Sequence, residues 1–312
     1  MKLCAAPYEL VFRRPIPARW DRVRCGALLR LEEPSLGIGF ADCHPWAERG
    51  DEPLDRQLAL LAKGKTTPLT ERSLFFARID AAARKNKRNL FDGLTIPSSH
   101  RLVMKPAENV FEEARREGFS VVKVKLGDDL ARTIPDVALK WRFDFGSAKR
   151  KTVESFLSKA SSSLRASIDF LEDPFPYDGE VWEEFSKQYD VSLARDRDVQ
   201  WAELAGVRVI IIKPAVVNPI PLMDIAHKTN RRVVFTSYLD HPLGQMTAAY
   251  SAALGARNFP GVVDTCGLLS HEVYEPNAFS ECLQRKGPAL LPPSGTGFGF
   301  DEVLEGLKWR EL

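Results

Sequence analysis

The chain has 312 residues, 44% of them hydrophobic, so it can bury a large core and exceeds the ~100–200 residues of one ordinary domain. We therefore expect one large domain and a smaller one. Its 44 Lys and Arg against 42 Asp and Glu leave a formal charge of +2, which supplies no surplus field for holding nucleic acid or an anionic membrane.

The first hundred residues predict a small α+β domain. They begin with hairpin character: a β-rich run at residues 8–12, a loop broken by Pro15 and Pro17, and the runs CGALLRLE and LGIGFADC. Residues 54–87 carry apolar positions at three- and four-residue spacing, which is typical of amphipathic helices. A sheet followed by helices predicts a capping (lid) domain over residues 1–97.

From about residue 100 the sequence changes to short β-branched runs separated by helical stretches. The runs are RLVMK, SVVKVKL, KWRFDF, ASIDFLE, VSLAR, VRVIII, RVVFTS and GVVDTC. Eight strands alternating with crossover segments predict an α/β fold, a (β/α)7β TIM-like barrel over residues 98–285. The turn-rich segment 286–312 is expected to pack back on the capping domain and complete it.

The cysteines and the N-terminus carry no export signal. Five scattered cysteines form no CxxC pair and are expected to be reduced packing residues. Charged Glu9 and Arg13 come too early for a signal-peptide core, and no window approaches ~20 uninterrupted apolar residues. These patterns predict a soluble cytoplasmic protein.

Charged residues interrupt or end five of the predicted barrel strands, where barrel active sites are built. Lys123 and Lys125 share one face of their strand because side chains alternate, and Arg142 and Asp144 do so on the next. Three more charged residues end later strands: Glu172 in FLEDP, Asp196 after VSLAR and Lys213 after VRVIII. A buried charge without a partner is costly, so these groups are expected to compensate one another.

The three carboxylates at these strand ends would repel one another in a closed site. A divalent cation relieves that repulsion, and oxygen ligands without clustered His or Cys favour a hard ion, Mg²⁺ first and Mn²⁺ second. The two lysines of the second strand and Lys213 on the sixth are expected to flank the ion from opposite sides. A lysine near a divalent cation and another ammonium loses its proton more easily, which makes an amine base available.

Together these motifs resemble the muconate-lactonizing branch of the enolase superfamily, and within it the o-succinylbenzoate synthase family. The resemblance spans nearly the whole chain in a series of short pieces: GIGFAD, VVKVKLG, RFDF, FLEDP, LARD, IIIKP, VVFTSYLDHPLG, GVVDTCGL and GTGFGF. It implies these roles: Asp144, Glu172 and Asp196 as metal ligands, Lys125 as the proton-abstracting base, Lys213 as the opposite lysine, and Lys123 as the lysine that supports the base.

The reaction implied by the resemblance is a dehydration in menaquinone biosynthesis. The substrate, 2-succinyl-6-hydroxy-2,4-cyclohexadiene-1-carboxylate, loses the proton next to its carboxylate, and the charge of the resulting enediolate is stabilised by Mg²⁺ and Lys213. Lys125 then protonates the leaving hydroxide, so one residue acts as base and acid in turn. The aromatic product is o-succinylbenzoate.

Substrate contacts are expected from a further group of residues. The resemblance assigns Arg142, Thr236 and Ser237 to the succinyl group or carboxylates of the substrate. Arg19 is another candidate, against the alternative of an ordinary exposed arginine. Asp264 ends the eighth predicted strand, where it either touches substrate or only terminates the strand.

Two departures from the family pattern affect the surroundings of the ligands. Gly146 stands where the family usually has Asn, and Arg197 where it usually has an acidic residue. Residues of this kind orient the metal ligands. His44, Trp46 and His241 lack metal-ligand spacing and are interpreted as packing or pocket lining.

Several functions share this set of residues. An N-succinylamino acid racemase or dipeptide epimerase would use the same metal ligands and opposed lysines, and so would a muconate-lactonizing enzyme. From other classes, a non-catalytic carboxylate-binding barrel and a metal-free Schiff-base lyase using Lys213 stay open, although the lyase would leave three buried carboxylates without a cation. The sequence fits a monomer and a homo-oligomer equally.

Overall fold

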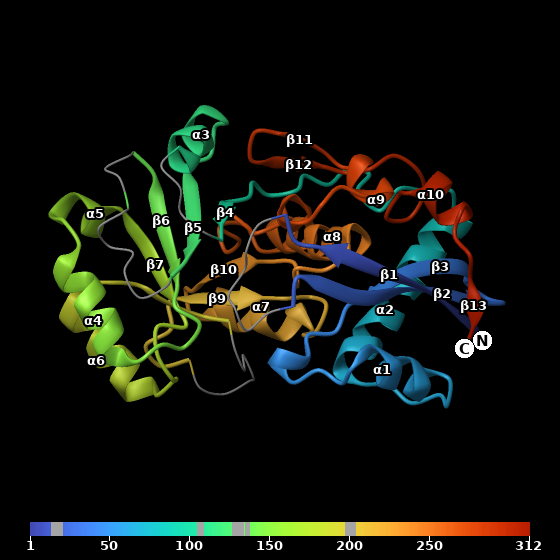
Figure 1. The fold of residues 1–312 in the computed structure, drawn as a ribbon, viewed down its shortest axis with the longest axis horizontal. Coiled ribbons are helices and arrows are strands. Elements are labelled where there is room, and N and C mark those ends of the chain that lie inside the picture. The colour runs from blue at the N-terminus through green and yellow to red at the C-terminus, as the bar shows by residue number, and fades with distance from the viewer. Residues whose placement is uncertain (14–20, 105–108, 127–133, 135–137, 197–203) are drawn as a thin grey trace.

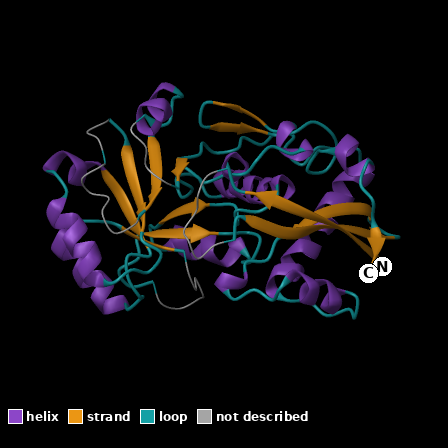
Figure 2. Ribbon diagram, viewed as in Figure 1, coloured by secondary structure: helices purple, strands orange, loops and turns teal. Residues whose placement is uncertain are grey.

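The computed structural model describes residues 1–13, 21–104, 109–126, 134, 138–196 and 204–312. A barrel of strands and helices occupies one side of the molecule, and a flatter sheet with two helices occupies the other (Figures 1 and 2). Both termini lie at the outer end of that flatter sheet (Figure 1). The prediction of a barrel with an N-terminal α+β cap is confirmed.

The cap is built on a four-stranded antiparallel sheet in the order β13-β1-β2-β3. Its strands are β1 Lys2–Val11, β2 Val23–Glu33, β3 Gly37–Cys43 and β13 Arg310–Glu311. Three helices follow β3: the 3-10 turn η1 Ala47–Arg49, α1 Leu54–Leu61 and α2 Pro68–Lys85. Because β13 pairs with β1, the C-terminal end of the chain completes the sheet. The exact boundaries at residues 97 and 285 stay a prediction.

Helix α2 lies unusually close to β3. A Cβ atom at Gly39 would come within 1.9 Å of the carbonyl oxygen of Ala77, so only glycine permits this approach. Asp80 of α2 fastens the layers, since it accepts hydrogen bonds from the backbone N–H of Phe40 (2.9 Å) and of Phe298 (2.7 Å). The cap sheet, its helix and the C-terminal segment are therefore one packed unit.

The barrel contains a parallel sheet in the order β10-β9-β8-β7-β6-β5-β4. Its strands are β4 Arg101–Val103, β5 Val121–Lys125, β6 Lys140–Asp144, β7 Ile168–Glu172, β8 Leu193–Arg195, β9 Val209–Ile212 and β10 Arg232–Phe235. The helices between and after them are α3 Val110–Arg116, α4 Arg150–Lys159, α5 Ser162–Ser167, α6 Gly179–Tyr189, α7 Pro219–Lys228 and α8 Pro242–Asn258. Seven of the eight predicted strands are thus present as strands.

The eighth predicted strand closes the barrel through single bridges. Val263 pairs with Val233 and Gly267 with Thr236 on the β10 side, while Cys266 pairs with Ser99 just before β4. Short elements follow: η3 Ser270–Val273, α9 Ala278–Glu281, β11 Gln284–Lys286, β12 Ala289–Leu291 and α10 Asp301–Glu305. Residues 262–267 therefore occupy the place that a (β/α)7β barrel requires.

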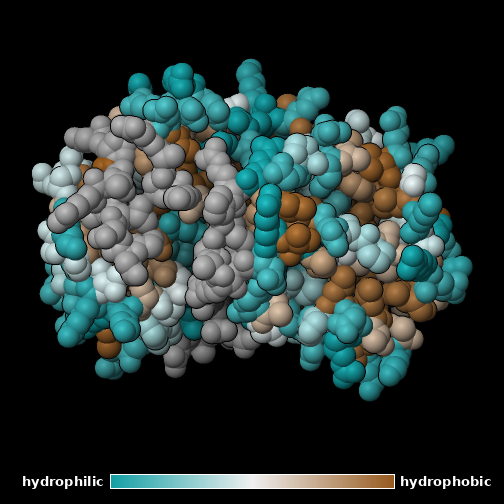
Figure 3. Space-filling model, viewed as in Figure 1, coloured by the Kyte–Doolittle hydropathy of each residue, from teal (hydrophilic) through white to brown (hydrophobic). Residues whose placement is uncertain are grey.

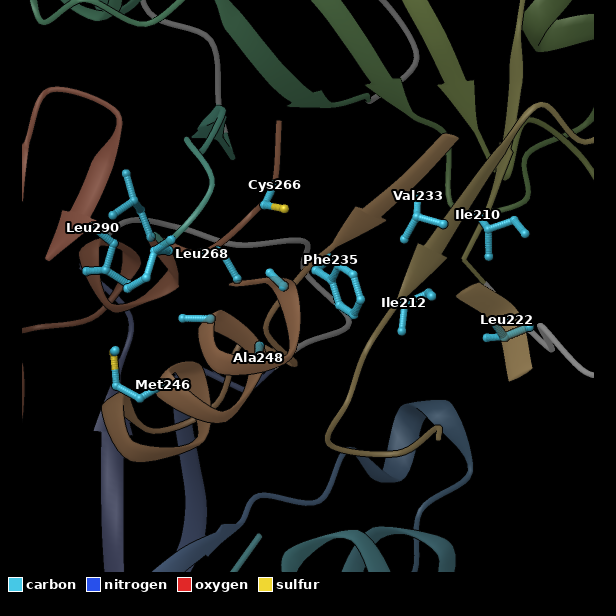
Figure 4. Close-up of a cluster of buried hydrophobic side chains, with 14 of the residues drawn as sticks. Ile210, Ile212, Leu222, Val233, Phe235, Met246, Ala248, Cys266, Leu268 and Leu290 are labelled. Atoms are coloured by element: carbon cyan, nitrogen blue, oxygen red, sulfur yellow. The ribbon is translucent and has the colours of Figure 1, made fainter. Parts of the chain in front are cut away.

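Alternating residues of the strands divide the core in two. Ile210, Ile212, Val233 and Phe235 point toward the surrounding helices, where they meet apolar side chains such as Leu222 of α7 (Figure 4). The intervening residues form a separate buried cluster inside the barrel: Phe170, Ala194, Val209, Ile211 and Val234. Polar residues that continue this inward alternation past the strand ends therefore reach the barrel mouth.

The described surface is polar in some parts and apolar in others. In the view of Figure 3, hydrophilic side chains cover much of the described surface, and the larger apolar groups gather over the cap half. The five cysteines are free thiols. Within the described residues, no helix combines the length and apolar character needed to cross a membrane.

Candidate active site

A pocket lies at the barrel mouth, where the strands end and the cap meets them. Its charged lining consists of Arg49, Lys123, Lys125, Asp144, Glu172, Asp196 and Lys213, and its other lining includes His100, Thr236, Ser237 and Ser270. The cavity measures about 50 Å³, far less than the ~300 Å³ or more of typical small-molecule sites. Charged side chains fill the mouth, so a ligand must move some of them.

Two lysines of β5 hold two of the carboxylates. The ammonium nitrogen of Lys123 lies 2.5 Å from Glu172 Oε1 and 3.2 Å from Asp144 Oδ2. The ammonium nitrogen of Lys125 lies 2.7 Å from Asp144 Oδ2. Register explains the arrangement, because Lys125 pairs with Asp144 across β5 and β6, and Asp144 with Glu172 across β6 and β7.

The third lysine comes from the other side of the barrel. Lys213 follows β9, which is separated from β5 by the three strands β6, β7 and β8. In an eight-membered ring that is half the circumference, so Lys213 faces Lys125 across the mouth. The amine of Lys213 contacts Asp196, and the Asp196 backbone N–H donates to Asp173 Oδ1 at 3.0 Å.

The lysines differ in how firmly they hold their protons. Burial acts to lower the pKa of Lys123, but Glu172 and Asp144 outweigh it and raise that pKa. Burial lowers the pKa of Lys125, and the charges of Lys123 and Arg49 add to this effect while Asp144 opposes it. Burial also lowers the pKa of Lys213, well below its ordinary value. Lys125 and Lys213 thus differ from Lys123 in the direction of their pKa shifts.

The donors at the mouth fit a hard divalent cation. Three carboxylates end the adjacent strands β6, β7 and β8, and oxygen donors of this kind suit Mg²⁺. Glu172 Oε2 is buried and lacks a hydrogen-bond partner within the described structure. No three acidic, His or Cys side chains of the described residues form a ready metal cluster; instead each of the three carboxylates pairs with an ammonium. An incoming cation would replace these ion pairs.

Hydroxyl groups line the mouth beside the lysines. Thr236 Oγ1 is buried, and no described group is hydrogen-bonded to it. Ser237 donates a hydrogen bond to Ser270 Oγ (2.6 Å), which in turn donates to Gln245 Oε1 (3.0 Å). Thr236 and Ser237, the two residues of the seventh predicted strand that the resemblance assigns to the substrate, thus both line the pocket.

Arg142 and Asp264 are not among the residues that line the pocket, so the substrate contact that the resemblance assigns to Arg142, and the one left open for Asp264, stay predictions. Arg142 is fully buried, and its guanidinium binds Asp169 Oδ2 (2.7 Å), the carbonyl oxygen of Thr265 (2.6 Å) and Asp264 Oδ2 (3.4 Å). The side chain of Arg142 shares the inward face of β6 with that of Asp144, but two residues along a strand span about 6.6 Å. Arg142 therefore lies one layer below Asp144.

The other sequence-based candidates fall into three groups. Arg19 and Arg197 lie outside the described residues. Gly146, at the position where the family usually has Asn, donates its backbone N–H to Asp144 Oδ1 at 3.1 Å. His44, Trp46 and His241 are buried side chains at the junction of cap and barrel, and none of them lines the pocket.

The structure adds two charged or titratable residues that the sequence analysis missed. Arg49 reaches the mouth from η1 of the cap and approaches Asp196 Oδ2 to 3.3 Å. His100, just before β4, lies 3.2 Å from Arg142, and burial with that positive charge holds its pKa well below the usual range. No motif marks either residue, because Arg49 sits in a polar turn and His100 precedes its strand.

Comparisons with known proteins agree with this geometry. A family model described as the O-succinylbenzoate synthase N-terminal domain matches residues 3–83. The o-succinylbenzoate synthase of Bdellovibrio bacteriovorus is 34% identical over 331 aligned residues, which cover 100% of this chain and 99% of that relative.

Solved structures show the same fold at low identity. A member of the enolase superfamily from Roseovarius nubinhibens, complexed with magnesium, has a TM-score of 0.77 at 15% identity over 100% of this chain and 97% of the other. The L-Ala-D/L-Glu epimerase of Bacillus subtilis, in a substrate-liganded complex, has a TM-score of 0.76 at 14% identity over 96% and 98%.

The capped barrel is the fold of this member of the enolase superfamily. Within that superfamily the full-length match is decisive. The chain belongs to the o-succinylbenzoate synthase family.

Proposed function

We propose that the chain is a carbon–oxygen lyase that dehydrates 2-succinyl-6-hydroxy-2,4-cyclohexadiene-1-carboxylate to o-succinylbenzoate. The observation that carries the proposal is the placement of Lys125 and Lys213 on opposite sides of one pocket that also holds three carboxylates. Membership of the o-succinylbenzoate synthase family supports the choice of substrate. The same proposal includes a place in menaquinone biosynthesis and a cytoplasmic location, as the sequence predicts.

Asp144, Glu172 and Asp196 are proposed to hold a divalent cation, Mg²⁺ in preference to Mn²⁺. Such an ion, when bound, supplies positive charge for the substrate carboxylate as negative charge develops on it. These carboxylates now pair with lysine amines, which would lose those partners if an ion were held there. The small cavity would then widen at the place where the substrate has to sit.

Lys125 is proposed to remove the proton next to the substrate carboxylate. Burial and the nearby positive charges lower the pKa of this lysine, which favours the neutral amine that a base requires. Lys123, whose pKa is raised, keeps its proton and supports Lys125 as a neighbouring positive charge. The two lysines of one strand thus divide the work of base and helper.

Lys213 is proposed to stabilise the enediolate from the opposite face. Negative charge growing on the substrate favours the ammonium form of this lysine, although burial disfavours it. Lys125, now protonated, transfers its proton to the departing hydroxyl, so that the C–O bond breaks and water leaves. The ring electrons move into the new double bond and the product is aromatic.

The substrate is proposed to contact the hydroxyls of Thr236 and Ser237. Thr236 Oγ1, buried without a described partner, is ready to donate a hydrogen bond to a substrate oxygen. Arg142 and Asp264 are left out of this set because they are bound to each other in the layer below. Arg19 stays a prediction of the sequence.

The deciding assay supplies the cyclohexadiene substrate with Mg²⁺ and follows formation of the aromatic product by ultraviolet absorbance. We expect turnover that EDTA abolishes and that Mg²⁺ restores. A parallel assay offers an N-succinylamino acid and measures racemization, because the opposed lysines suit that reaction as well. Racemization without dehydration would replace our substrate with that of a racemase, and binding without either activity would indicate a carboxylate-binding barrel.

A further inference from the structure

We propose that Arg49 of the cap binds the second, succinyl carboxylate of the substrate and so selects dicarboxylates over monocarboxylates. The inference rests on the proposed function, and it concerns a residue that no sequence motif marks. Arg49 lies on η1, outside the barrel, yet its guanidinium lines the same pocket as the lysines. The cap thereby contributes a positive charge directly to the site.

The segment that carries Arg49 is firmly fixed. Asp51 accepts a hydrogen bond from the backbone N–H of Trp46 (2.9 Å) and another from the hydroxyl of Tyr238 (3.0 Å). Arg24 stacks over the Trp46 ring at 3.9 Å and forms two hydrogen bonds with Glu48, of 2.7 and 2.9 Å. This network joins the cap turn to the loop after β10, so the backbone of Arg49 has a defined position over the mouth.

The guanidinium of Arg49, in contrast, is held loosely. Within the described structure its ion pair is a single contact of 3.3 Å with Asp196. The centroids of the Trp46 and Tyr238 rings lie 6.0 and 5.5 Å from its central carbon. A carboxylate bound by both arms of the fork would be considerably stronger. The side chain is 25% exposed, which leaves room for such a partner on its open side.

Charge at the mouth points to an anionic partner. The pocket is lined by Arg49, which keeps its positive charge, by three lysines and by three carboxylates. A divalent cation held by these carboxylates would add two positive charges and would compete with Arg49 for Asp196. The proposed substrate carries two carboxylates, one at the reacting centre near the lysines and one on the succinyl chain. Arg49, displaced from Asp196, is the cation best shaped for the second.

The first test compares binding of o-succinylbenzoate with binding of its succinyl methyl ester, by calorimetry in the presence of Mg²⁺. We expect wild-type protein to prefer the diacid by about 10–100-fold, the range for one charge-assisted contact. In Arg49→Met this preference should fall to near one, and Arg49→Lys should keep part of it. A preference that persists in Arg49→Met would overturn the inference.

Two controls separate binding from folding. Arg56→Ala removes an exposed arginine of α1, elsewhere on the cap, and should leave the preference at its wild-type value. Thermal unfolding of Arg49→Met should match that of Arg56→Ala. If Arg49→Met unfolds early, the comparison of diacid with ester in Arg49→Lys decides, because a purely structural role would weaken both ligands equally.

Steady-state kinetics distinguish this inference from the proposed function. A wild-type chain that does not dehydrate the cyclohexadiene substrate contradicts the proposed function. If the wild type is active, we expect Arg49→Met to raise KM by about 10–100-fold with kcat within a few-fold, as lost binding outside the reacting centre predicts. An unchanged KM with reduced kcat would instead place Arg49 in the chemistry and contradict the inference.

Discussion

Two charged layers lie inside the same barrel, and they are built from different cations. At the mouth, lysines pair with carboxylates, for example Lys125 with Asp144 at 2.7 Å. One layer down, Arg142 and Arg232 each touch both Asp169 and Asp264. Lysine can lose its proton, whereas arginine keeps its charge and binds in a fixed fork.

The surroundings of the carboxylates follow the same division. Burial acts to raise the pKa of Asp169, but the two arginines outweigh it and lower that pKa. Burial also acts to raise the pKa of Asp144, and Lys125 and Lys123 outweigh it and lower that pKa. A divalent cation could take the place of these two lysines. The mouth is thus a rearrangeable layer suited to chemistry, and the lower layer a permanent one suited to holding strands together.

The largest expected effect comes from removing the base at the mouth. Lys125→Met should reduce turnover by about 10²–10⁴-fold, the usual contribution of general acid–base catalysis. Its free energy of unfolding should change little, because Asp144 keeps Lys123 at 3.2 Å. Lys140→Met, at the exposed start of β6, is the matched control and should retain full turnover. Activity surviving in Lys125→Met would remove it as the base.

A substitution in the lower layer should reduce stability rather than turnover. Arg142→Met removes one of the two arginines that bind Asp169 and Asp264 and leaves them with Arg232 alone, so the free energy of unfolding should fall by about 1–3 kcal/mol. Chemical denaturation measures this loss. KM should stay near its wild-type value in the protein that folds. A raised KM with unchanged stability would restore the substrate contact that the sequence predicted.

The contrast between these layers shows what the sequence could and could not reveal. The period of two along each strand placed Lys123, Lys125 and Asp144 on the inward face, and the strand ends located Glu172 and Lys213. Alternation carries no information about depth, however. The chain also shifts register by a bulge between β6 and β7, next to Arg142, which no sequence pattern announced.

Contacts between distant segments were equally beyond the sequence. Arg49 and Asp196 are 147 residues apart and belong to the cap and the barrel. Their meeting depends on how the cap docks, and docking reflects packing of the whole surface rather than any local motif. The fold class could be predicted because each strand and helix has its own periodicity, whereas the cap's contribution to the site could not.

A third buried cluster sharpens the comparison because its carboxyl groups have no cation. Asp42 and Asp240 flank Gly244 at the junction of cap and barrel, and no Lys or Arg of the described residues pairs with them. Asp42 is hydrogen-bonded to the hydroxyl of Tyr8 (2.6 Å) and to the backbone N–H of His241 (3.0 Å). Burial raises the pKa of Asp42 to about 7 and that of Asp240 well above its usual range.

These raised pKa values predict how stability depends on pH. Between about pH 4, where unfolded carboxyls titrate, and about pH 7, the carboxyl group of Asp42 binds more protons in the folded chain than in the unfolded chain. The cluster's contribution to the free energy of unfolding is therefore complete below pH 4 and is lost as the pH rises to 7. Asp42→Asn mimics the protonated form. In this variant the free energy of unfolding should fall by about 1–4 kcal/mol less than in the wild type between pH 4 and pH 7.

Denaturation curves at several pH values measure that slope. Asp55→Asn, at an exposed position of α1, is the matched control and should leave the slope unchanged. An identical slope in wild type and Asp42→Asn would mean that Asp42 is ionised in the folded state. In that case this site would tolerate a buried, ionised carboxylate without a cation. The pairing of carboxylates with cations in the two barrel layers would then not be required by burial.

The smallest effect is expected at the surface, where the same kind of ion pair exists without burial. Lys228 and Asp224 lie 2.6 Å apart on α7, with side chains 69% and 50% exposed. Water screens such a pair, so Lys228→Ala should change the free energy of unfolding by only about 0.5 kcal/mol or less. A loss as large as that of Arg142→Met would show that charge pairing alone, rather than pairing of buried charges, stabilises this barrel. We expect instead that the contribution of each ion pair to the free energy of unfolding depends on how completely its charges are removed from water.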